Sequence, residues 1–376
     1  MGTDGASSSG ESAVDQLMDW AIVLGERARR RSAPNPWVGC VLVRDGMIVG
    51  EGASEAPGGP HAETAALAAA GDRARGATAV VTLEPCVHQG RTGPCAEALV
   101  DAGVERVVVA LEDPDSRVSG RGFARLAEAG IEVVTEVGAD EVARSLAPYL
   151  HHRRTGRSAC LAKIATSVDG RAAAADGSSK WITGPGARAD AHELRADSQA
   201  IVVGAGTALA DQPRLTVRAE VTPAPIRPPV RVLVDGRGRV PATGPLFETR
   251  DAPTMVLTSD TAAPRVVDAW IAAGAKVEVL PAAPGGVALD AVLATLGSLG
   301  VLQAMVEGGP TLLGALLGAG LVDRMIVYVA PTVLGDRALP AVSGWSPPTL
   351  ADAERFELRG VSTLGADVRL EYEVSR

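Results

Sequence analysis

Aromatic residues and cysteines are both scarce in this sequence. Phenylalanine, tryptophan and tyrosine make up 3% of the 376 residues, whereas hydrophobic residues make up 46%, so we expect cores filled mainly by alanine, valine and leucine. The four cysteines are too few for a disulfide framework in a chain of this length. We therefore expect reduced thiols and a cytoplasmic protein.

Long apolar runs and basic clusters are also lacking. No stretch of about 18 apolar residues could span a bilayer, and the N-terminus lacks a signal-peptide pattern, so no membrane association is expected. The formal net charge is −9, with lysine and arginine scattered along the chain. Nucleic-acid binders normally carry a basic patch, so no nucleic-acid partner is expected. A small phosphorylated substrate is compatible, since two or three arginines can hold one phosphate.

Three residues in the first half have side chains suited to zinc. His61, Cys86 and Cys95 offer one imidazole and two thiolates, and three protein ligands leave a fourth position for water. Glu63 lies two residues from His61, so its carboxylate can take a proton from that water and pass it to a leaving amine. This pattern predicts the zinc site of a deaminase, in which the glutamate is not a ligand.

The first half alternates between helix and strand patterns. Residues 1–12 are rich in glycine and serine and predict a disordered tail, and residues 13–153 predict a three-layer α/β domain. Helices are expected at 13–31, 62–70, 95–102 and 122–129, and strands at 40–44, 47–52, 79–83, 106–111 and 131–134. Asp45-Gly46 predicts a hairpin turn. The polar turn at 155–157 predicts a domain boundary.

Residues 158–376 predict a second α/β domain without an internal repeat of the first. Strands are expected at 160–165, 200–203, 230–234, 254–258, 276–280, 304–306 and 324–329, with a closing edge strand at 368–374, and helices at 186–195, 263–273, 290–299 and 311–319. Glycine-containing segments at 204–207 and 307–311 follow strands, and the second leads into a helix, as in a phosphate cradle. Neither is a G-x-G-x-x-G fingerprint, so an ordinary Rossmann domain is not expected.

Several longer motifs resemble one enzyme family over nearly the whole chain. They are 35–39, 61–63 and 82–95 in the first half, and Lys163, 167–171, 179–183, 209–218 and 306–312 in the second. The eight-residue gap between Cys86 and Cys95 resembles the riboflavin branch of the zinc deaminases, whereas nucleic-acid deaminases use a two-residue gap. Together the motifs resemble the bifunctional deaminase/reductases of riboflavin biosynthesis.

The resemblance implies a fold, two cofactors and two reactions. The fold is a cytidine-deaminase-like domain followed by a dihydrofolate-reductase-like α/β domain, and the cofactors are zinc and NADPH. The reactions are hydrolytic deamination of a diamino-ribosylaminopyrimidinone 5′-phosphate and reduction of its ribosyl group to ribityl. The zinc ligands fall on His61, Cys86 and Cys95, and the catalytic proton shuttle on Glu63. NADPH contacts fall on Ala165, Trp181, Thr207, Asp211, Gly236, Gly309, Pro310, Thr311, Leu312, Leu313, Gly314 and Ala315, and substrate contacts on Ser179, Arg195, Leu215, Arg218 and Glu307.

Two alternatives remain open at the level of sequence. Val87 and Gln212 depart from the family's usual residues, which would suit a related enzyme acting on a modified pyrimidine. A zinc-stabilised scaffold without turnover is the other, although it would need neither Glu63 nor an open zinc position. His88 and Lys163 could each contact a ligand or have a purely structural role, and the sequence does not decide between the two. A homo-oligomer is expected.

Overall fold

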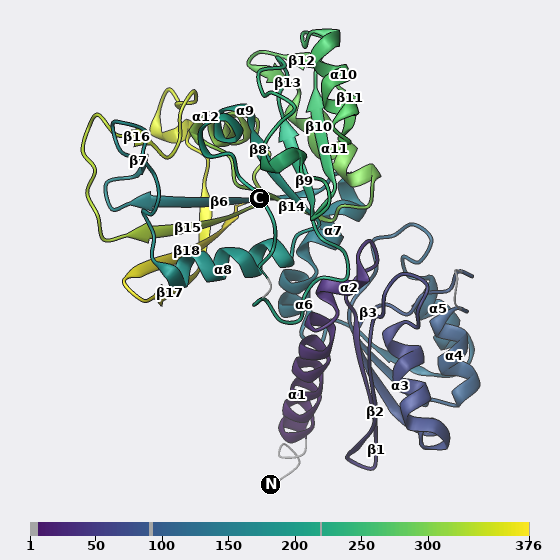
Figure 1. Cartoon of the computed structure of the whole chain (residues 1–376). Helices are drawn as coiled ribbons and strands as arrows, with labels where there is room; N and C mark the ends of the chain where they lie inside the picture. The colour runs from purple at the N-terminus through teal and green to yellow at the C-terminus, as the bar shows by residue number, and fades with distance from the viewer. Residues whose placement is uncertain (1–6, 90–92, 219, 376) are drawn as a thin grey trace. The chain divides into compact units, whose positions relative to one another are not determined.

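The computed structural model describes residues 7–89, 93–218 and 220–375. It divides the chain into two compact units, Met1–Thr155 and Gly156–Arg376 (Figure 1). Each unit has its own main sheet, with five strands in the first and nine in the second. Among the described residues, no helix is long and apolar enough to cross a membrane.

The first unit is a five-stranded sheet with helices on both sides. Its helices are α1 (Ser7–Glu26), α2 (Arg29–Ser32), α3 (Ala62–Ala70), α4 (Cys95–Ala102), α5 (Arg121–Glu128), α6 (Ala139–Ser145) and α7 (Ala147–Thr155). Its strands are β1 (Gly39–Arg44), β2 (Met47–Ala53), β3 (Thr78–Leu83), β4 (Arg106–Leu111) and β5 (Glu132–Val134). The strand order is β2-β1-β3-β4-β5, with β1 antiparallel to both neighbours and β3, β4 and β5 parallel.

Helix α1 begins earlier than the sequence predicted. The predicted disordered tail is wrong for residues 7–12, which are helical, while residues 1–6 lie outside the described part of the chain. Met18, Ala21 and Leu24 are buried and anchor this helix. Once a helix is anchored, each residue added at its end gains a backbone hydrogen bond, so the helix extends beyond its apolar face.

Glycines let two helices approach opposite faces of this sheet closely. A Cβ atom on Gly39 of β1 would collide with the backbone carbonyl of Ala21 in α1. A Cβ atom on Gly52 of β2 would collide with the backbone carbonyl of Ala62 in α3. In Figure 1, α3, α4 and α5 lie on one side of the sheet and α1 on the other. The predicted three-layer arrangement is therefore confirmed, with the start of α3 held tightly against β2.

The second unit has one large sheet and two short strand pairs. Its helices are α8 (Pro185–Ala196), α9 (Ala205–Asp211), α10 (Pro264–Ala272), α11 (Leu289–Ser298) and α12 (Pro310–Gly318). Its strands are β6 (Ala159–Ser167), β7 (Arg171–Ala173), β8 (Ala200–Gly204), β9 (Val230–Val234), β10 (Thr254–Thr258), β11 (Lys276–Val279), β12 (Ala282–Ala283), β13 (Gly286–Val287), β14 (Gln303–Val306), β15 (Arg324–Ala330), β16 (Leu339–Pro340), β17 (Phe356–Leu364) and β18 (Asp367–Val374).

The large sheet has the order β11-β10-β9-β8-β14-β6-β15-β18-β17. The strands from β11 to β15 run parallel, whereas β18 and β17 are antiparallel to their neighbours. Alternate residues of the strands point into two separate apolar cores; for example, Leu161 lies in one and Cys160 in the other. Trp270 of α10 fills the first core and Leu316 of α12 the second, so helices cover both faces.

The prediction of β18 as the edge strand is wrong. Strand β18 lies inside the sheet, and the edge is β17, which the sequence analysis missed. Most residues of β17 are at least partly exposed, including Leu358 and Val361, so it lacks the alternation between buried and exposed residues by which a strand is recognised. Helix α9 was also missed, because no helix was predicted to begin in the glycine-containing segment at 204–207.

Candidate active sites

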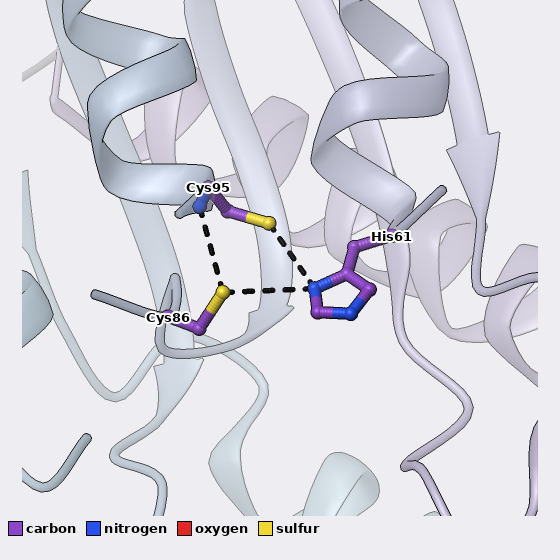
Figure 2. Close-up of side chains that lie close together, drawn as sticks. All are labelled: His61, Cys86 and Cys95. Carbon is purple, nitrogen blue, oxygen red and sulfur yellow. Dashed lines mark hydrogen bonds between the residues drawn. The ribbon is translucent and has the colours of Figure 1, made fainter. Parts of the chain in front are cut away.

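The three predicted zinc ligands meet in the first unit. The Nδ1 atom of His61 lies 3.3 Å from Sγ of Cys95 and 3.6 Å from Sγ of Cys86, and the three donor atoms lie within 4.8 Å of one another. Figure 2 shows His61 at the start of α3, Cys95 at the start of α4 and Cys86 in the loop after β3, with all three side chains pointing to one place. One nitrogen and two sulfurs at this spacing fit a zinc ion with an open fourth position.

Hydrogen bonds shift the pKa values of the Cys86 and Cys95 thiols in opposite directions. Hydrogen bonding with Cys95 lowers the pKa of Cys86 to about 4, assisted by His61. The backbone N–H of Cys95 also donates to Sγ of Cys86, at 3.4 Å. Conversely, the hydrogen bond to Cys86 and burial raise the pKa of Cys95. The pair therefore holds one thiolate ready, and a divalent cation would favour the second.

Glu63 is placed beside this cluster, as the sequence predicted. It lies in the first turn of α3 and is 4% exposed. Burial, together with the nearby charge of Cys86, raises its pKa to about 7. Its carboxylate therefore stands next to the zinc donors in a place shielded from bulk water.

Glu84 is a site residue that the sequence analysis missed. Its carboxylate accepts backbone N–H bonds from Asp113 at 3.2 Å, Gly120 at 3.0 Å and Gly122 at 2.7 Å. It is two residues from Cys86 and 3% exposed. A charged residue between a buried strand and a metal ligand was the available signal. Glu84 fixes the loop before α5 against the segment that carries Cys86.

A cavity of about 1340 Å³ occupies the second unit. It opens where β6, β8, β9 and β14 end, which is where open α/β sheets bind ligands. Nearly all of the predicted cofactor and substrate residues line it: Ala165, Ser179, Trp181, Arg195, Thr207, Asp211, Leu215, Arg218, Gly236, Glu307, Gly309, Pro310, Thr311, Leu312, Leu313 and Ala315. Lys163 lines it as well.

Gly314 is the exception among the predicted contacts. It is not among the residues that line the cavity, and a Cβ atom there would collide with the backbone of Ser343. The structure thus places Gly314 against Ser343, and its contact with the cofactor stays a prediction. On a helix, neighbouring residues face different directions, so a continuous run from 309 to 315 cannot face one ligand throughout.

The start of α12 offers the cradle that the glycines predicted. Gly309 precedes the helix, and a Cβ atom on it would lie 2.9 Å from Oγ1 of Thr207 at the start of α9. Without side chains at Gly308 and Gly309, backbone N–H groups at the helix N-terminus can approach an anion. This part of the cavity fits the pyrophosphate of a dinucleotide.

Arg195 and Glu307 form a buried ion pair in the same cavity. Nη2 of Arg195 donates to Oε2 of Glu307 at 2.9 Å, Nε donates to Oε1, and Nη1 donates to the carbonyl of Thr216 at 3.0 Å. Arg195 is engaged on both sides of its guanidinium, as a buried cation requires partners inside the protein. Its guanidinium is occupied by Glu307, whereas Arg218 lines the same cavity and stays the predicted contact for a phosphate.

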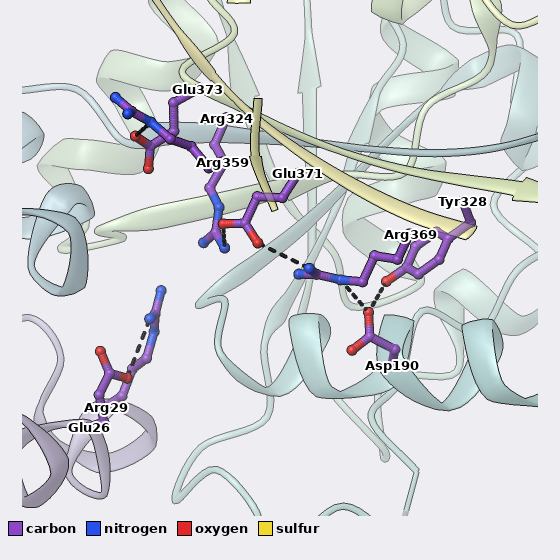
Figure 3. Close-up of polar contacts among 9 residues, drawn as sticks. All are labelled: Glu26, Arg29, Asp190, Arg324, Tyr328, Arg359, Arg369, Glu371 and Glu373. Carbon is purple, nitrogen blue, oxygen red and sulfur yellow. Dashed lines mark hydrogen bonds and ion pairs between the residues drawn. The ribbon is translucent and has the colours of Figure 1, made fainter. Parts of the chain in front are cut away.

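Lys163 and a chain of ion pairs continue this polar region. Nζ of Lys163 lies 5.8 Å from the ring centre of Tyr328, and burial lowers its pKa against the opposing charge of Glu307. The Tyr328 hydroxyl donates to Asp190 of α8, which also accepts from Nε of Arg369 at 2.9 Å. Figure 3 shows this chain, which continues from Arg369 through Glu371 to Arg324. Tyr328, whose ring lies near Nζ of Lys163, is thus held in place through Asp190 by Arg369 of strand β18.

The two units also match known families separately. Residues 11–111 match the family described as the cytidine and deoxycytidylate deaminase zinc-binding region, and residues 159–370 match the RibD C-terminal domain. With the zinc donors in one unit and the lined cavity in the other, these matches define a zinc-dependent deaminase joined to an NADPH-dependent reductase.

Relatives match over nearly the full chain. Riboflavin biosynthesis protein RibD of Escherichia coli (strain K12) is 42% identical over 367 residues, which are 95% of this chain and 98% of that protein. RibD of Acinetobacter baumannii has a solved structure with a TM-score of 0.87 and 39% identity, covering 97% of this chain and 100% of that chain. A deaminase/reductase from Thermotoga maritima gives a TM-score of 0.85 at 30% identity, with the same coverage.

The chain belongs to the RibD family of bifunctional deaminase/reductases in riboflavin biosynthesis. This confirms the family predicted from the motifs, the two-part α/β fold class, and zinc and NADPH as cofactors.

Proposed function

We propose that this enzyme deaminates a diaminohydroxyphosphoribosylaminopyrimidine in its first unit and reduces the ribosyl group of the product in its second. The observation that carries the proposal is the presence of both sites in one chain: the converging His61, Cys86 and Cys95 beside Glu63, and the cavity around Glu307. The Thermotoga maritima relative is described with these two activities.

In the first unit, His61, Cys86 and Cys95 would hold zinc. When bound, zinc supplies a Lewis acid that lowers the pKa of a water molecule. The carboxylate of Glu63 takes a proton as the water oxygen bonds to the amidine carbon, then returns it to the departing nitrogen. The products are ammonia and a carbonyl on the pyrimidine ring.

In the second unit, the cavity residues position the ribosyl group for reduction. When bound, NADPH would supply a hydride for the anomeric carbon, whose bond to the ring oxygen opens while that oxygen takes a proton from water. Glu307, oriented by Arg195, can accept hydrogen bonds from the ribose hydroxyls, and Arg218 can pair with the 5′-phosphate. No described side chain is a required acid here, so positioning and electrostatics carry this step.

A comparison of substrates tests the deaminase assignment. Zinc-loaded protein is incubated with the phosphoribosylaminopyrimidine, and in parallel with deoxycytidylate, while ammonia is measured. We expect ammonia from the first compound alone. Ammonia release from deoxycytidylate would assign the first unit to nucleotide deamination. Release from neither compound would favour one of the two alternatives, a related enzyme that acts on a modified pyrimidine or a zinc-stabilised scaffold without turnover.

We also propose a cellular location and an oligomeric state for the enzyme. It works in the cytoplasm as a homo-oligomer, without a nucleic-acid partner. All four cysteines are free thiols, which suits a reducing compartment. The net charge of −9 disfavours nucleic-acid binding.

A further inference from the structure

His192 is a titratable residue of the reductase cavity that neither proposed reaction uses. It is half-buried, belongs to α8 and lines the cavity together with Arg195, Arg218 and Glu307. His192 and Arg195 are three residues apart, a spacing that places two side chains on the same face of a helix. The imidazole and the Arg195 guanidinium therefore face the cavity from the same side.

One nitrogen of His192 is buried and unpaired. Its Nδ1 atom has no hydrogen-bond partner among the described residues. Buried polar atoms of native proteins nearly always have a partner, so an unpaired nitrogen in a ligand cavity indicates that something other than the protein completes the site. Arg195 differs in this respect, because its guanidinium already donates to Glu307 and to the carbonyl of Thr216.

The surroundings of His192 favour its neutral form. Burial, followed by the positive charges of Arg195 and Arg218, lowers the pKa of His192 to about 4. The negative charges of Glu307 and Glu220 act in the opposite direction. Glu307 is paired with Arg195, which balances much of its charge. At neutral pH the imidazole is therefore uncharged, although it lies within reach of two cations.

A phosphate bound in this part of the cavity would reverse the balance of charge around His192. A phosphate monoester carries a charge of about −1.5 to −2 at pH 7. It would offset the charges of Arg195 and Arg218, and a nearby negative charge favours the protonated form of histidine. Because the charge of Arg218 already acts on the imidazole, a phosphate held by Arg218 would lie within electrostatic reach of His192.

We propose that His192 joins Arg218 in holding the 5′-phosphate of the reductase substrate and takes up a proton from solvent as the phosphate binds. This inference rests on the proposed reductase function. The protonated imidazole donates a charge-assisted hydrogen bond to a phosphate oxygen, which is stronger than a bond from a neutral ring. The site thus gains a positive charge when the substrate binds, and protons strengthen that binding.

Nuclear magnetic resonance of the full-length, zinc-loaded protein tests the proton uptake. The probe is D-ribose 5-phosphate, and the reporter is the C2–H signal of His192, assigned by its absence from the spectrum of H192Q. In the free protein, we expect this signal to stay at the position of a neutral imidazole between about pH 5.5 and pH 8. With saturating D-ribose 5-phosphate it should titrate with a midpoint at about pH 6.5–7.

Calorimetric binding of the same probe tests what His192 contributes to affinity. We expect H192Q to bind it roughly four- to tenfold more weakly than the wild type near pH 6 and to differ much less near pH 8, because a ligand that raises a pKa gains affinity as pH falls toward that pKa. A purely structural role would weaken binding equally at both pH values. His152→Gln removes an imidazole from α7 of the first unit, outside the cavity, and should change neither affinity.

The outcomes separate this inference from the reductase proposal. A His192 signal that does not respond to saturating D-ribose 5-phosphate would overturn the proton uptake, as would a loss of affinity in H192Q that is the same at both pH values. Either result leaves the reductase proposal standing if the wild-type enzyme oxidises NADPH with the deaminated substrate. Absence of NADPH oxidation with that substrate would overturn the reductase proposal and this inference with it.

Discussion

In the proposed mechanism, the deaminase chemistry depends most on Glu63. We expect Glu63→Gln to lower the rate of ammonia release by about 10² to 10⁴, because glutamine cannot carry the proton. Zinc content should stay at the wild-type level, since Glu63 is not one of the three donors. Rate and metal content are measured on the same preparation. Glu97→Gln, in the half-buried pair with Arg125, is the control. A zinc-loaded Glu63→Gln enzyme with the wild-type rate would remove the proposed mechanism.

Glu307 makes the stability of the second unit depend on pH. Burial alone would raise its pKa, but the charges of Arg195 and Lys163 lower it to about 2, from an ordinary value of 4.5. A carboxyl with a lowered folded-state pKa stabilises the fold above its unfolded pKa, and this stabilisation is lost as pH falls toward the folded value.

The thermal unfolding midpoint should therefore fall between about pH 5 and pH 2 more steeply in the wild type than in Glu307→Gln. The variant keeps an oxygen for Arg195 but has no carboxyl to titrate. Midpoints measured at several pH values in this window test this. Parallel curves for the two proteins would contradict it.

Individual site residues were predictable where residue type and local spacing define the chemistry. His61, Glu63, Cys86 and Cys95 are of this kind, and the structure brings them together. The occupation of Arg195 by Glu307 was not predictable, because it depends on a contact between residues 112 positions apart. The backbone bonds of Glu84 were missed for the same reason.

At the scale of elements, close packing of α3 on β2 positions the zinc site. Gly52→Ala would push the backbone at Ala62, between His61 and Glu63, away from the strand. Overpacking of this kind costs about 1–3 kcal/mol. We expect a lower urea midpoint and faster zinc loss to a chelator. Met47→Ala, at a position of β2 that is 67% exposed, should change neither. Unchanged zinc retention in Gly52→Ala would show that α3 is not held this way.

Elements with a strong local signal were also the ones that the sequence predicted. Asp45 and Gly46 both have positive φ, 52° and 73°, as the predicted hairpin turn requires. Strand β17 gave no such signal, because most of its side chains are exposed and only pairing with β18 defines it. The boundaries of α1 moved for a similar reason, since helix ends depend little on side-chain pattern.

At the scale of the whole molecule, each unit contains its own sheet and its own complete site. The zinc donors all belong to Met1–Thr155, and the cavity residues all belong to Gly156–Arg376. We therefore expect His61→Ala to abolish ammonia release without impairing NADPH oxidation when the deaminated intermediate is supplied. Initial rates of the two half-reactions test this. Loss of both activities in a folded variant would contradict two self-contained sites.

The most direct test of the account supplies the diamino substrate and NADPH to the wild-type enzyme in one tube. Ammonia and oxidised NADPH are measured over the same course. Two consecutive reactions predict equal final amounts of ammonia and oxidised NADPH, with ammonia appearing first. Ammonia without NADPH oxidation would mean that the second unit reduces a different compound, and would contradict the bifunctional account.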